Sequence, residues 1–265
     1  MSNKLGFIGC GKMAKAIING TISAGFDKKN IIASSSSELS AEKNSKELNI
    51  NVVANNKKVV EFADTIFIAT KPNQVIEILS EIKDLINNEK LIISLAAGIS
   101  TEKIEVYTNS APVIRVMPNT PVLVKEGISA TVKGKFATNS HEQFVQKILS
   151  KIGKVISVQE NQIDVVTAIS GSGPAFFYQI FEDFAQAGVK LGLDYDKALL
   201  LAVQTAIGSA KMTLNRKTPL TDLVASVATK GGCTEVGIQT MYNLESEKMF
   251  FEIIKNTAQK AHELG

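Results

Sequence analysis

The sequence predicts an α/β protein, with a doubly wound sheet in residues 1–160 and an all-helical domain in residues 161–265. Three observations support this prediction. An apolar run at Leu5–Ile8 leads through a glycine turn into the apolar spacing of a helix. Further short apolar runs then alternate with helical patterns, which is typical of a mostly parallel sheet. After Asn161 the strand patterns stop, and the rest of the chain has helical spacing.

The turn after the first strand has the pattern Gly-x-Gly-x-x-Ala, formed by Gly9, Gly11 and Ala14. Gly9 permits the tight turn, Gly11 lets the backbone approach a pyrophosphate, and Ala14 allows close packing of helix on strand. A helix is expected from Lys12 to Ala24, ending at Gly25, and its first-turn amides suit a phosphate. The pattern therefore indicates a Rossmann-type dinucleotide-binding domain. The alternative is a purely structural glycine turn.

Serines follow the second strand, which is expected at Asn30–Ser34 and precedes Ser35, Ser36 and Ser37. Sites that prefer NAD place a carboxylate at this strand end, about 20 residues past the glycines, to bind the ribose hydroxyls. Serine hydroxyls can donate to a 2′-phosphate, and no carboxylate repels it. The sequence therefore favours NADP(H), and NAD(H) stays open because no Arg accompanies the serines. The same serines can cap a helix before Leu39, a role compatible with the first.

Later strands carry further candidate positions at the edge where doubly wound sheets bind ligands. We expect these strands within Asp64–Pro72, Lys90–Gly98, 111–121, 127–134 and 153–158. The first of them ends at Lys71-Pro72, which turns the chain into a helix. The second ends in Ala96, Ala97 and Gly98, where a flat ring could lie against the backbone.

Charge and hydropathy exclude several classes of partner. The chain has 29 basic and 26 acidic residues, a net charge of +3, and no cluster of five or six like charges. We therefore expect neither nucleic acid nor a membrane surface as a partner. No apolar run approaches the roughly 20 residues of a membrane span. The first strand begins so early that we expect no signal peptide, and hence a cytoplasmic protein.

The chain contains two cysteines and two histidines. Cys10 and Cys233 lie in glycine loops, where a small side chain is favoured, and neither has the spacing of a metal site. His141 lies in a helix-start sequence and His262 among the last few residues. We therefore expect no metal, and surface or capping roles for both histidines.

The helical half has two long segments, residues 176–193 and 195–214, that are apolar over more than one face. Such helices need burial on several sides, so we expect an intersubunit core and at least a homodimer. Two glycine loops, Ala168–Phe177 and Ala228–Gly237, are expected to turn into helices whose free amides suit a carboxylate. Thr234 can cap the second helix or bond a substrate atom, and its spacing alone favours the cap.

At these loops the sequence resembles pyrroline-5-carboxylate reductases, and it does so over essentially the whole chain. The resemblance rests on FIGCGKMA, ATKPNQV, SLAAG, MPNTPVLVKEG, ISGSGPAFFYQIFEDFAQAGVKLGL and the later GGCT. It implies an NAD(P)H-dependent oxidoreductase that reduces a small cyclic imino acid, 1-pyrroline-5-carboxylate, to L-proline, the last step of proline biosynthesis. It also implies a Rossmann domain followed by an interlocked helical dimer, often assembled into a decamer.

The resemblance implies site residues as well. Cofactor contacts are implied at Ile8, Gly9, Cys10, Gly11, Lys12, Met13, Ser34, Ser35, Asn56, Ala69, Thr70, Lys71, Pro72, Ala96, Ala97 and Gly98. Substrate contacts are implied at Cys233 and Thr234. The chemistry that fits is hydride transfer from the nicotinamide to the imine carbon, with a proton added to nitrogen. We expect the amides of Gly232 to Thr234 to hold the substrate carboxylate and the Thr234 hydroxyl to orient its nitrogen, as the catalytic residue.

Some positions depart from the family pattern. Ala228–Lys230 stands where the family usually has Ser/Thr-Ser-Pro, and Ser226 where it often has Asn or Gln, which bears on substrate affinity. Two other interpretations stay open. A related two-domain hydroxyacid dehydrogenase normally has a Lys one or two turns into the helix after the second glycine motif, whereas this chain has none between Gly173 and Lys190. A non-catalytic nucleotide-binding paralogue is suggested only by the departure at Lys230.

Overall fold

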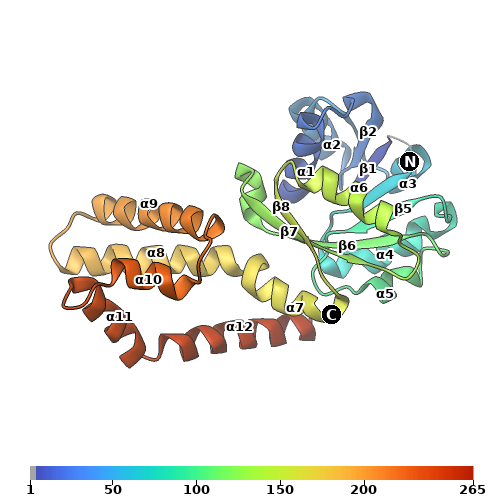
Figure 1. Ribbon diagram of the computed structural model, residues 1–265. Coiled ribbons are helices and arrows are strands. Elements are labelled where there is room, and N and C mark those ends of the chain that lie inside the picture. Colours follow the sequence, from blue (N-terminus) through green and yellow to red (C-terminus); the bar gives the residue numbers. More distant parts are fainter. Residues whose placement is uncertain (1–3, 265) are drawn as a thin grey trace. The chain divides into compact units, whose positions relative to one another are not determined.

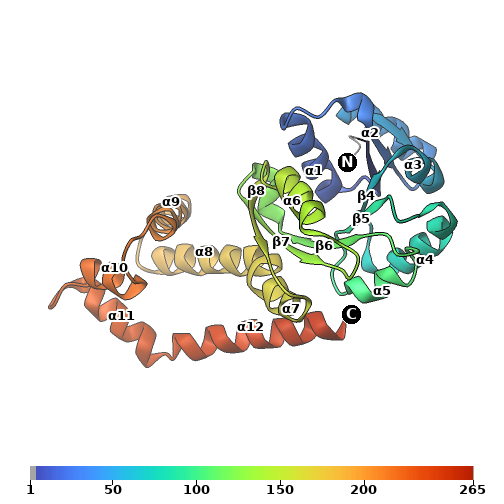
Figure 2. The same ribbon diagram turned by 45° about the vertical axis from the view of Figure 1, so that its right-hand side comes forward.

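The computed structural model describes residues 4–264, which form an eight-stranded sheet in the order β3-β2-β1-β4-β5-β6-β7-β8 (Figure 1). The strands are β1 (Leu5–Ile8), β2 (Ile31–Ser34), β3 (Asn51–Val53), β4 (Thr65–Ile68), β5 (Leu91–Ser94), β6 (Val113–Pro118), β7 (Gly127–Lys133) and β8 (Gly153–Ser157). Neighbouring strands are parallel except for the antiparallel pair β6 and β7, and Figure 2 shows β4 to β8 side by side in this order. The mostly parallel sheet is confirmed. Its strand order reverses between β1 and β4, and ligands bind at such a point.

The chain forms two compact units, one of residues 4–172 with 257–264 and one of residues 173–256. The helices of the first unit are α1 (Lys12–Ser23), α2 (Glu38–Leu48), α3 (Asn56–Phe62), α4 (Pro72–Ile82), α5 (Thr101–Glu105), α6 (Asn139–Leu149), α7 (Ile163–Val166) and the end of α12 (Ser246–Glu263). The first helix therefore begins at the predicted residue and ends one residue early. The predicted domain division at residue 160 precedes the division between the units and stays a prediction.

The core of the first unit lies on both faces of the sheet. Helices α1, α2 and α6 cover one face, and α3, α4 and α5 cover the other (Figure 1). Neighbouring strand residues serve opposite faces, as the pleat requires: Phe7 belongs to the first and Ile8 to the second. Phe7, two residues before Gly9, stacks on Phe67 of β4 with ring centroids 4.5 Å apart. This packing fixes the strand ends that carry the candidate site.

An ion pair with a buried guanidinium joins three elements of the first unit. Arg115 of β6 is 4% exposed and pairs with Glu160, in the short helical turn η4 (Glu160–Gln162). The other carboxylate oxygen of Glu160 accepts from the amide of Thr101, at 3.1 Å, and from its hydroxyl, at 2.6 Å. Thr101 begins α5, so this one carboxylate holds together β6, α5 and the segment that leads into the helical half.

The first glycine loop of the helical half differs from the prediction. Residues 168–177 were expected to contain a turn, but the backbone is helical throughout, with a π-helical turn, η5 (Thr167–Gly171), between α7 and α8 (Gly173–Lys190). The amide of Ser172 is therefore already bonded to the carbonyl of Thr167 at 2.8 Å. Gly171 is small because a Cβ there would lie 2.6 Å from Cε of Met117. Gly171 therefore serves close packing, whereas a Cβ at Gly173 would meet no atom within 4 Å. The bonded Ser172 amide is not free for a carboxylate, contrary to what the sequence suggested.

The second unit consists of helices with little internal core. They are α8, α9 (Tyr195–Leu214), α10 (Leu220–Val227), α11 (Cys233–Asn243) and the first part of α12. Between residues 174 and 256 only Ala185 and Ala198 are buried, while Phe184 is 65% and Leu200 67% exposed. The predicted helices are confirmed, and so is their many-sided apolar surface. None of the helices in residues 4–264 is long and apolar enough to cross a membrane.

Candidate active site

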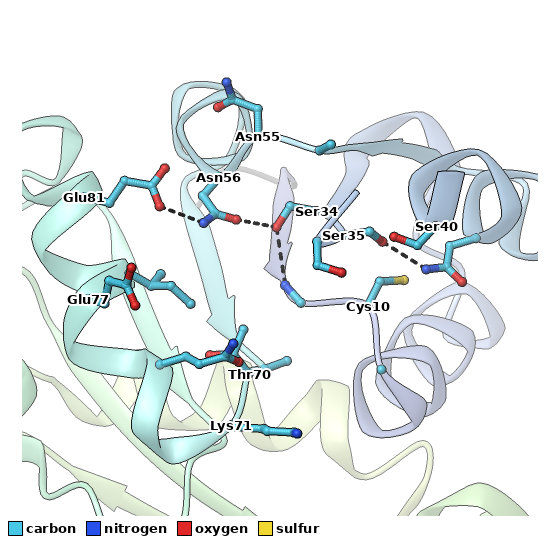
Figure 3. A pocket seen from close by; sticks show the side chains of 18 residues that line it. Cys10, Ser34, Ser35, Ser40, Asn55, Asn56, Thr70, Lys71, Glu77 and Glu81 are labelled. Atoms are coloured by element: carbon cyan, nitrogen blue, oxygen red, sulfur yellow. Dashed lines mark hydrogen bonds between the residues drawn. The ribbon is translucent and has the colours of Figure 1, made fainter. Parts of the chain in front are cut away.

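A candidate site is a cavity of about 720 Å³ at the carboxyl ends of β1, β2 and β4 (Figure 3). It lies in the first unit, at the point where the strand order reverses. The glycine turn, the serines after β2, the start of α3 and one face of α4 form its walls. Its position and polar lining fit a dinucleotide.

The glycine turn has the backbone geometry that its sequence predicts. Gly9 has a φ of +92°, and a Cβ there would lie 2.8 Å from the carbonyl oxygen of Ala69. By contrast, a Cβ at Gly11 would meet no atom within 4 Å, so this glycine leaves open space above the turn. Gly11 is the N-cap of α1, with no side-chain cap and no acidic residue in the first turn. The amides and the positive end of the helix dipole are therefore available to a phosphate.

A chain of hydrogen bonds crosses the cavity from α4 to the glycine turn (Figure 3). The carboxylate of Glu81 accepts from Nδ2 of Asn56 at 2.8 Å. Oδ1 of Asn56 accepts from the hydroxyl of Ser34 at 2.7 Å, and Oγ of Ser34 accepts from the amide of Gly9 at 3.3 Å. Ser34 is 2% exposed. The predicted residues Ser34 and Asn56 are thus brought together with Gly9, and their bonds join four elements of the fold.

The next serines have separate partners. Oγ of Ser35 accepts from Nδ2 of Asn44 on α2 at 2.9 Å, and both side chains line the cavity. Ser37 is the N-cap of α2 and forms a capping box with Ser40. The capping role considered for the serines is therefore confirmed at Ser37. Ser35 remains at the cavity wall.

Other predicted cofactor residues divide among several places. The cavity is lined by Gly9, Cys10, Gly11, Ser34, Ser35, Asn56, Ala69, Thr70 and Lys71. Pro72, Ala97 and Gly98 instead line a neighbouring cavity of about 410 Å³, together with Thr167, Ser172 and the end of α12. Lys12 faces a third cavity, Ile8 and Ala96 are buried in the core, and Met13 packs against it. Their assignment to a cofactor stays a prediction.

Sequence reasoning missed several residues of the cavity wall. Asn44 and Ser40 come from α2, and Gln74, Glu77 and Glu81 come from α4. A signal for the last three was present, because positions 74, 77 and 81 recur at the spacing of one helix face. They are polar residues spread along one face of α4, from near its start to near its end.

The side chain of Thr70 suits a polar ligand in the cavity. Oγ1 of Thr70 is buried and has no hydrogen-bond partner among the described residues, although the residue lines the cavity. An unpaired buried hydroxyl of this kind fits a bound polar group.

Burial raises the pKa of the Cys10 thiol above its usual value, an effect that nearby Lys15 opposes and Glu47 reinforces. The raised pKa favours the neutral thiol, which is consistent with a packing role.

The second predicted site lies at the start of α11, in the second unit. Its N-cap is Gly232, with no side-chain cap, so Cys233 and Thr234 are the first two helical residues and Thr234 is not the cap that its spacing favoured. The Thr234 hydroxyl has no hydrogen bond to any described residue and is half-buried. The amide of Gly231 donates to Glu235 at 2.7 Å, and that of Gly232 to the carbonyl of Thr229 at 2.9 Å. Of the three amides predicted to hold a carboxylate, those of Cys233 and Thr234 are left without an intrahelical partner.

The histidines have the minor roles that the sequence predicts. His141 is part of a capping box with Thr138 at the start of α6, and burial lowers its pKa below 6.5. His262 lies on the surface beside Asp164, with 3.1 Å between Nδ1 and Oδ2. No group of three His, Cys, Asp or Glu side chains within residues 4–264 could hold a metal ion.

Comparison with known proteins gives three findings. Residues 160–264 match the family model described as pyrroline-5-carboxylate reductase dimerisation, and residues 4–98 match that described as NADP oxidoreductase coenzyme F420-dependent. The chain is 36% identical to the pyrroline-5-carboxylate reductase of Methanosarcina acetivorans, over 100% of this chain and 98% of the relative.

Solved structures agree with this. The pyrroline-5-carboxylate reductase of Coxiella burnetii superposes with a TM-score of 0.93 at 30% identity, covering 99% of this chain and 98% of that chain. The pyrroline carboxylate reductase of Plasmodium falciparum, solved with NADP bound, has a TM-score of 0.87 at 30% identity, with the same coverage of both chains.

The doubly wound sheet, its glycine turn and the helical half, with the two family models, define a pyridine-nucleotide-dependent oxidoreductase with a dimerisation domain. Among such oxidoreductases, sequence identity above 30% over essentially the full length to several pyrroline-5-carboxylate reductases identifies the family. The chain belongs to the pyrroline-5-carboxylate reductase family.

Proposed function

We propose that this chain reduces the cyclic imine 1-pyrroline-5-carboxylate to L-proline with a reduced nicotinamide dinucleotide, NADPH in preference to NADH. The observation that carries the proposal is the full-length match to reductases of this name, joined to a cavity that fits a dinucleotide. When bound, the dinucleotide supplies a hydride to the imine carbon, while the imine nitrogen takes up a proton. The cytoplasmic location stays a prediction of the sequence.

The protein's own part is to hold two molecules and orient them. At the dinucleotide cavity, the open space above Gly11 and the first-turn amides of α1 receive the pyrophosphate. At the start of α11, the amides of Cys233 and Thr234 hold the substrate carboxylate. The Thr234 hydroxyl, unbonded within the described residues, donates to or accepts from the substrate nitrogen.

The activity is tested by following NADPH oxidation with 1-pyrroline-5-carboxylate, and in parallel with pyruvate-type and hydroxyacid substrates. A reductase turns over the cyclic imine alone. Turnover of a hydroxyacid would favour the related dehydrogenases, and dinucleotide binding without turnover of any cyclic imine would identify a non-catalytic paralogue.

Thr234→Ala tests the role of the hydroxyl. Because Thr234 is not the N-cap, its loss should leave the melting temperature unchanged, whereas a lost cap costs about 0.5–2 kcal/mol. We expect kcat/KM to fall at least roughly tenfold, which is about 1.4 kcal/mol of transition-state stabilisation, with NADPH affinity unchanged. Thr234→Ser keeps the hydroxyl and should keep most of the activity. Normal turnover by Thr234→Ala would remove Thr234 from the mechanism.

The preference for NADPH is supported by the hydrogen bond between Asn44 and Ser35. Because the oxygen of Ser35 accepts from Asn44, its hydroxyl proton is free to donate to a 2′-phosphate. By contrast, the proton of Ser34 is already given to Asn56. No carboxylate follows β2 directly, where one would bind the ribose of NAD.

Ser35→Asp should reverse the preference, because a carboxylate repels the 2′-phosphate and accepts from the ribose hydroxyl. The matched control is Ser37→Asp, which adds the same charge two residues later at an N-cap, where Asp is equally favoured. The two dissociation constants, for NADPH and NADH, are measured by fluorescence titration of each variant. A wild-type protein that prefers NADH would contradict this assignment, as would equal effects of the two substitutions.

Assembly is the remaining proposal. The dimerisation model that matches residues 160–264 and the exposed apolar side chains of α8 and α9 support a homodimer whose helices bury one another. Assembly of such dimers into a decamer is proposed on the family resemblance alone.

A further inference from the structure

We propose that Glu81 of α4 is a positioning residue for dinucleotide binding, which acts through Asn56 and Ser34 on the glycine turn without touching the cofactor. The inference rests on the proposed use of a dinucleotide. It starts from the hydrogen-bond chain that crosses the cavity (Figure 3).

The first step is the orientation of the Asn56 amide. A side-chain amide has a donor end and an acceptor end, whereas an ionised carboxylate only accepts. Glu81 therefore selects the orientation in which Nδ2 of Asn56 faces it, at 2.8 Å. The same choice turns Oδ1 of Asn56 towards the hydroxyl of Ser34, at 2.7 Å.

The second step concerns the single proton of Ser34. Because Oδ1 of Asn56 accepts that proton, a lone pair of Ser34 remains for the amide of Gly9. In the opposite orientation, Nδ2 of Asn56 would donate to Ser34. The serine proton would then face the Gly9 amide, which is also a donor, or would be left without a partner in a nearly closed space. The orientation set by Glu81 is thus the one that lets Ser34 hold the turn.

The third step links this chain to binding. Gly9 is at the bend of the phosphate-binding turn. The hydrogen bond from its amide to the hydroxyl oxygen of Ser34 ties that bend to β2. Ser34 is the last residue of β2 and precedes Ser35, which faces the cavity. If this hydrogen bond is weakened, the turn is less ordered before binding. The dinucleotide must then order the turn, and this entropic cost lowers its affinity. The net value of one such hydrogen bond corresponds to a roughly three- to tenfold change in affinity.

The alternative is that Glu81 matters only as a negative charge beside an anionic ligand. In that case its removal would strengthen binding, because like charges repel. The structure provides a matched control in Glu77, which lies one helical turn earlier on α4, lines the same cavity and is exposed as Glu81 is. Asn56 bonds Glu81 and not Glu77. Removal of the Glu81 carboxylate should therefore weaken dinucleotide binding if it positions Asn56, and strengthen binding if it acts only as a charge.

The experiment measures NADPH and NADH dissociation constants by fluorescence titration of cofactor-free protein, alongside melting curves. We expect Glu81→Ala to weaken both dinucleotides about three- to tenfold, since the turn is common to both. Glu77→Ala should bind at least as tightly as wild type, and Glu81→Gln should be close to wild type because its amide oxygen still accepts from Asn56. Melting temperatures should be equal, because Glu81 is exposed.

A double substitution makes the test specific to the chain of bonds. In an Asn56→Ala background there is no amide to orient, so adding Glu81→Ala should have no further effect on affinity. Glu81→Ala binding that is unchanged or tighter would overturn the proposal, as would full additivity with Asn56→Ala or weak binding by Glu81→Gln. A wild-type protein that binds neither dinucleotide would overturn the proposed function itself, and with it this inference.

Discussion

Removal of the Glu160 carboxylate should destabilise the first unit more than most single substitutions would. Glu160→Ala leaves the guanidinium of Arg115, 4% exposed, without its counter-charge, and takes the acceptor from both the amide and the hydroxyl of Thr101. Nε of Arg115 already has no partner among the described residues, so no spare bond compensates. The substitution therefore leaves one buried charge and two polar groups unpaired.

The size of the effect follows from the burial of the pair. Breaking a buried ion pair by removing one partner costs about 3–5 kcal/mol. The Glu160 side chain is 35% exposed, so water can enter the space it leaves and solvate part of the guanidinium. We therefore take the lower end, about 3 kcal/mol, which corresponds to a fall in melting temperature of roughly 6–12 °C for a chain of this size.

The assay is thermal unfolding followed by circular dichroism at one fixed protein concentration, because assembly makes the melting temperature depend on concentration. Glu160→Gln is the control. It keeps an acceptor for Thr101 and loses only the charge, so its fall in melting temperature should be smaller than that of Glu160→Ala. The double variant Arg115→Met, Glu160→Leu removes both charges and should recover part of the stability. A melting temperature of Glu160→Ala within about 2 °C of wild type would refute the reasoning, since such a shift is under 1 kcal/mol.

Two further predictions follow from the glycine turn and from the helical half. Gly9→Ala should lower the melting temperature and abolish dinucleotide binding, because φ is +92° and the new Cβ would lie 2.8 Å from the Ala69 oxygen. Gly11→Ala should keep the wild-type melting temperature and only weaken binding, because its Cβ would meet no atom within 4 Å. Gly9→Ala with wild-type stability would count against the steric argument. Light scattering at micromolar concentration should give at least twice the 28.5 kDa mass of the chain, and a well-behaved monomer would contradict the proposed assembly.

Local pattern was enough to predict much of this fold. The run Leu5–Ile8, the glycine turn and the start of α1 at Lys12 lie where the sequence places them, because apolar period and glycine conformation are properties of a few neighbouring residues. β3 was missed, since it has three residues and only Val52 is buried. The turn expected at 168–177 was wrong because the backbone there is helical, with a π-helical turn in which Gly171 packs against Met117.

The candidate site was predictable to a smaller extent. Gly9, Ser34 and Ser35 could be placed because they follow strands whose ends share one edge of the sheet. Their partners were not placed from the sequence. Asn44 lies nine positions after Ser35, on the next helix, whereas the bond of Asn56 to Glu81 spans 25 positions. Residues at such distances meet only through tertiary packing, which no local period encodes.

The division of the chain into units has a consequence for biosynthesis. The first unit is discontinuous: its chain leaves at Ser172 and returns at Thr257, and the returning segment places His262 against Asp164, 98 positions earlier. A ribosome that has released the whole sheet has therefore not yet released the segment that completes this unit. Closing so long a loop costs more conformational entropy than closing the shorter loops between paired strands of the sheet. The nucleotide-binding fold can thus form during translation, while its last helical segment docks only after the helices of the second unit have been synthesised.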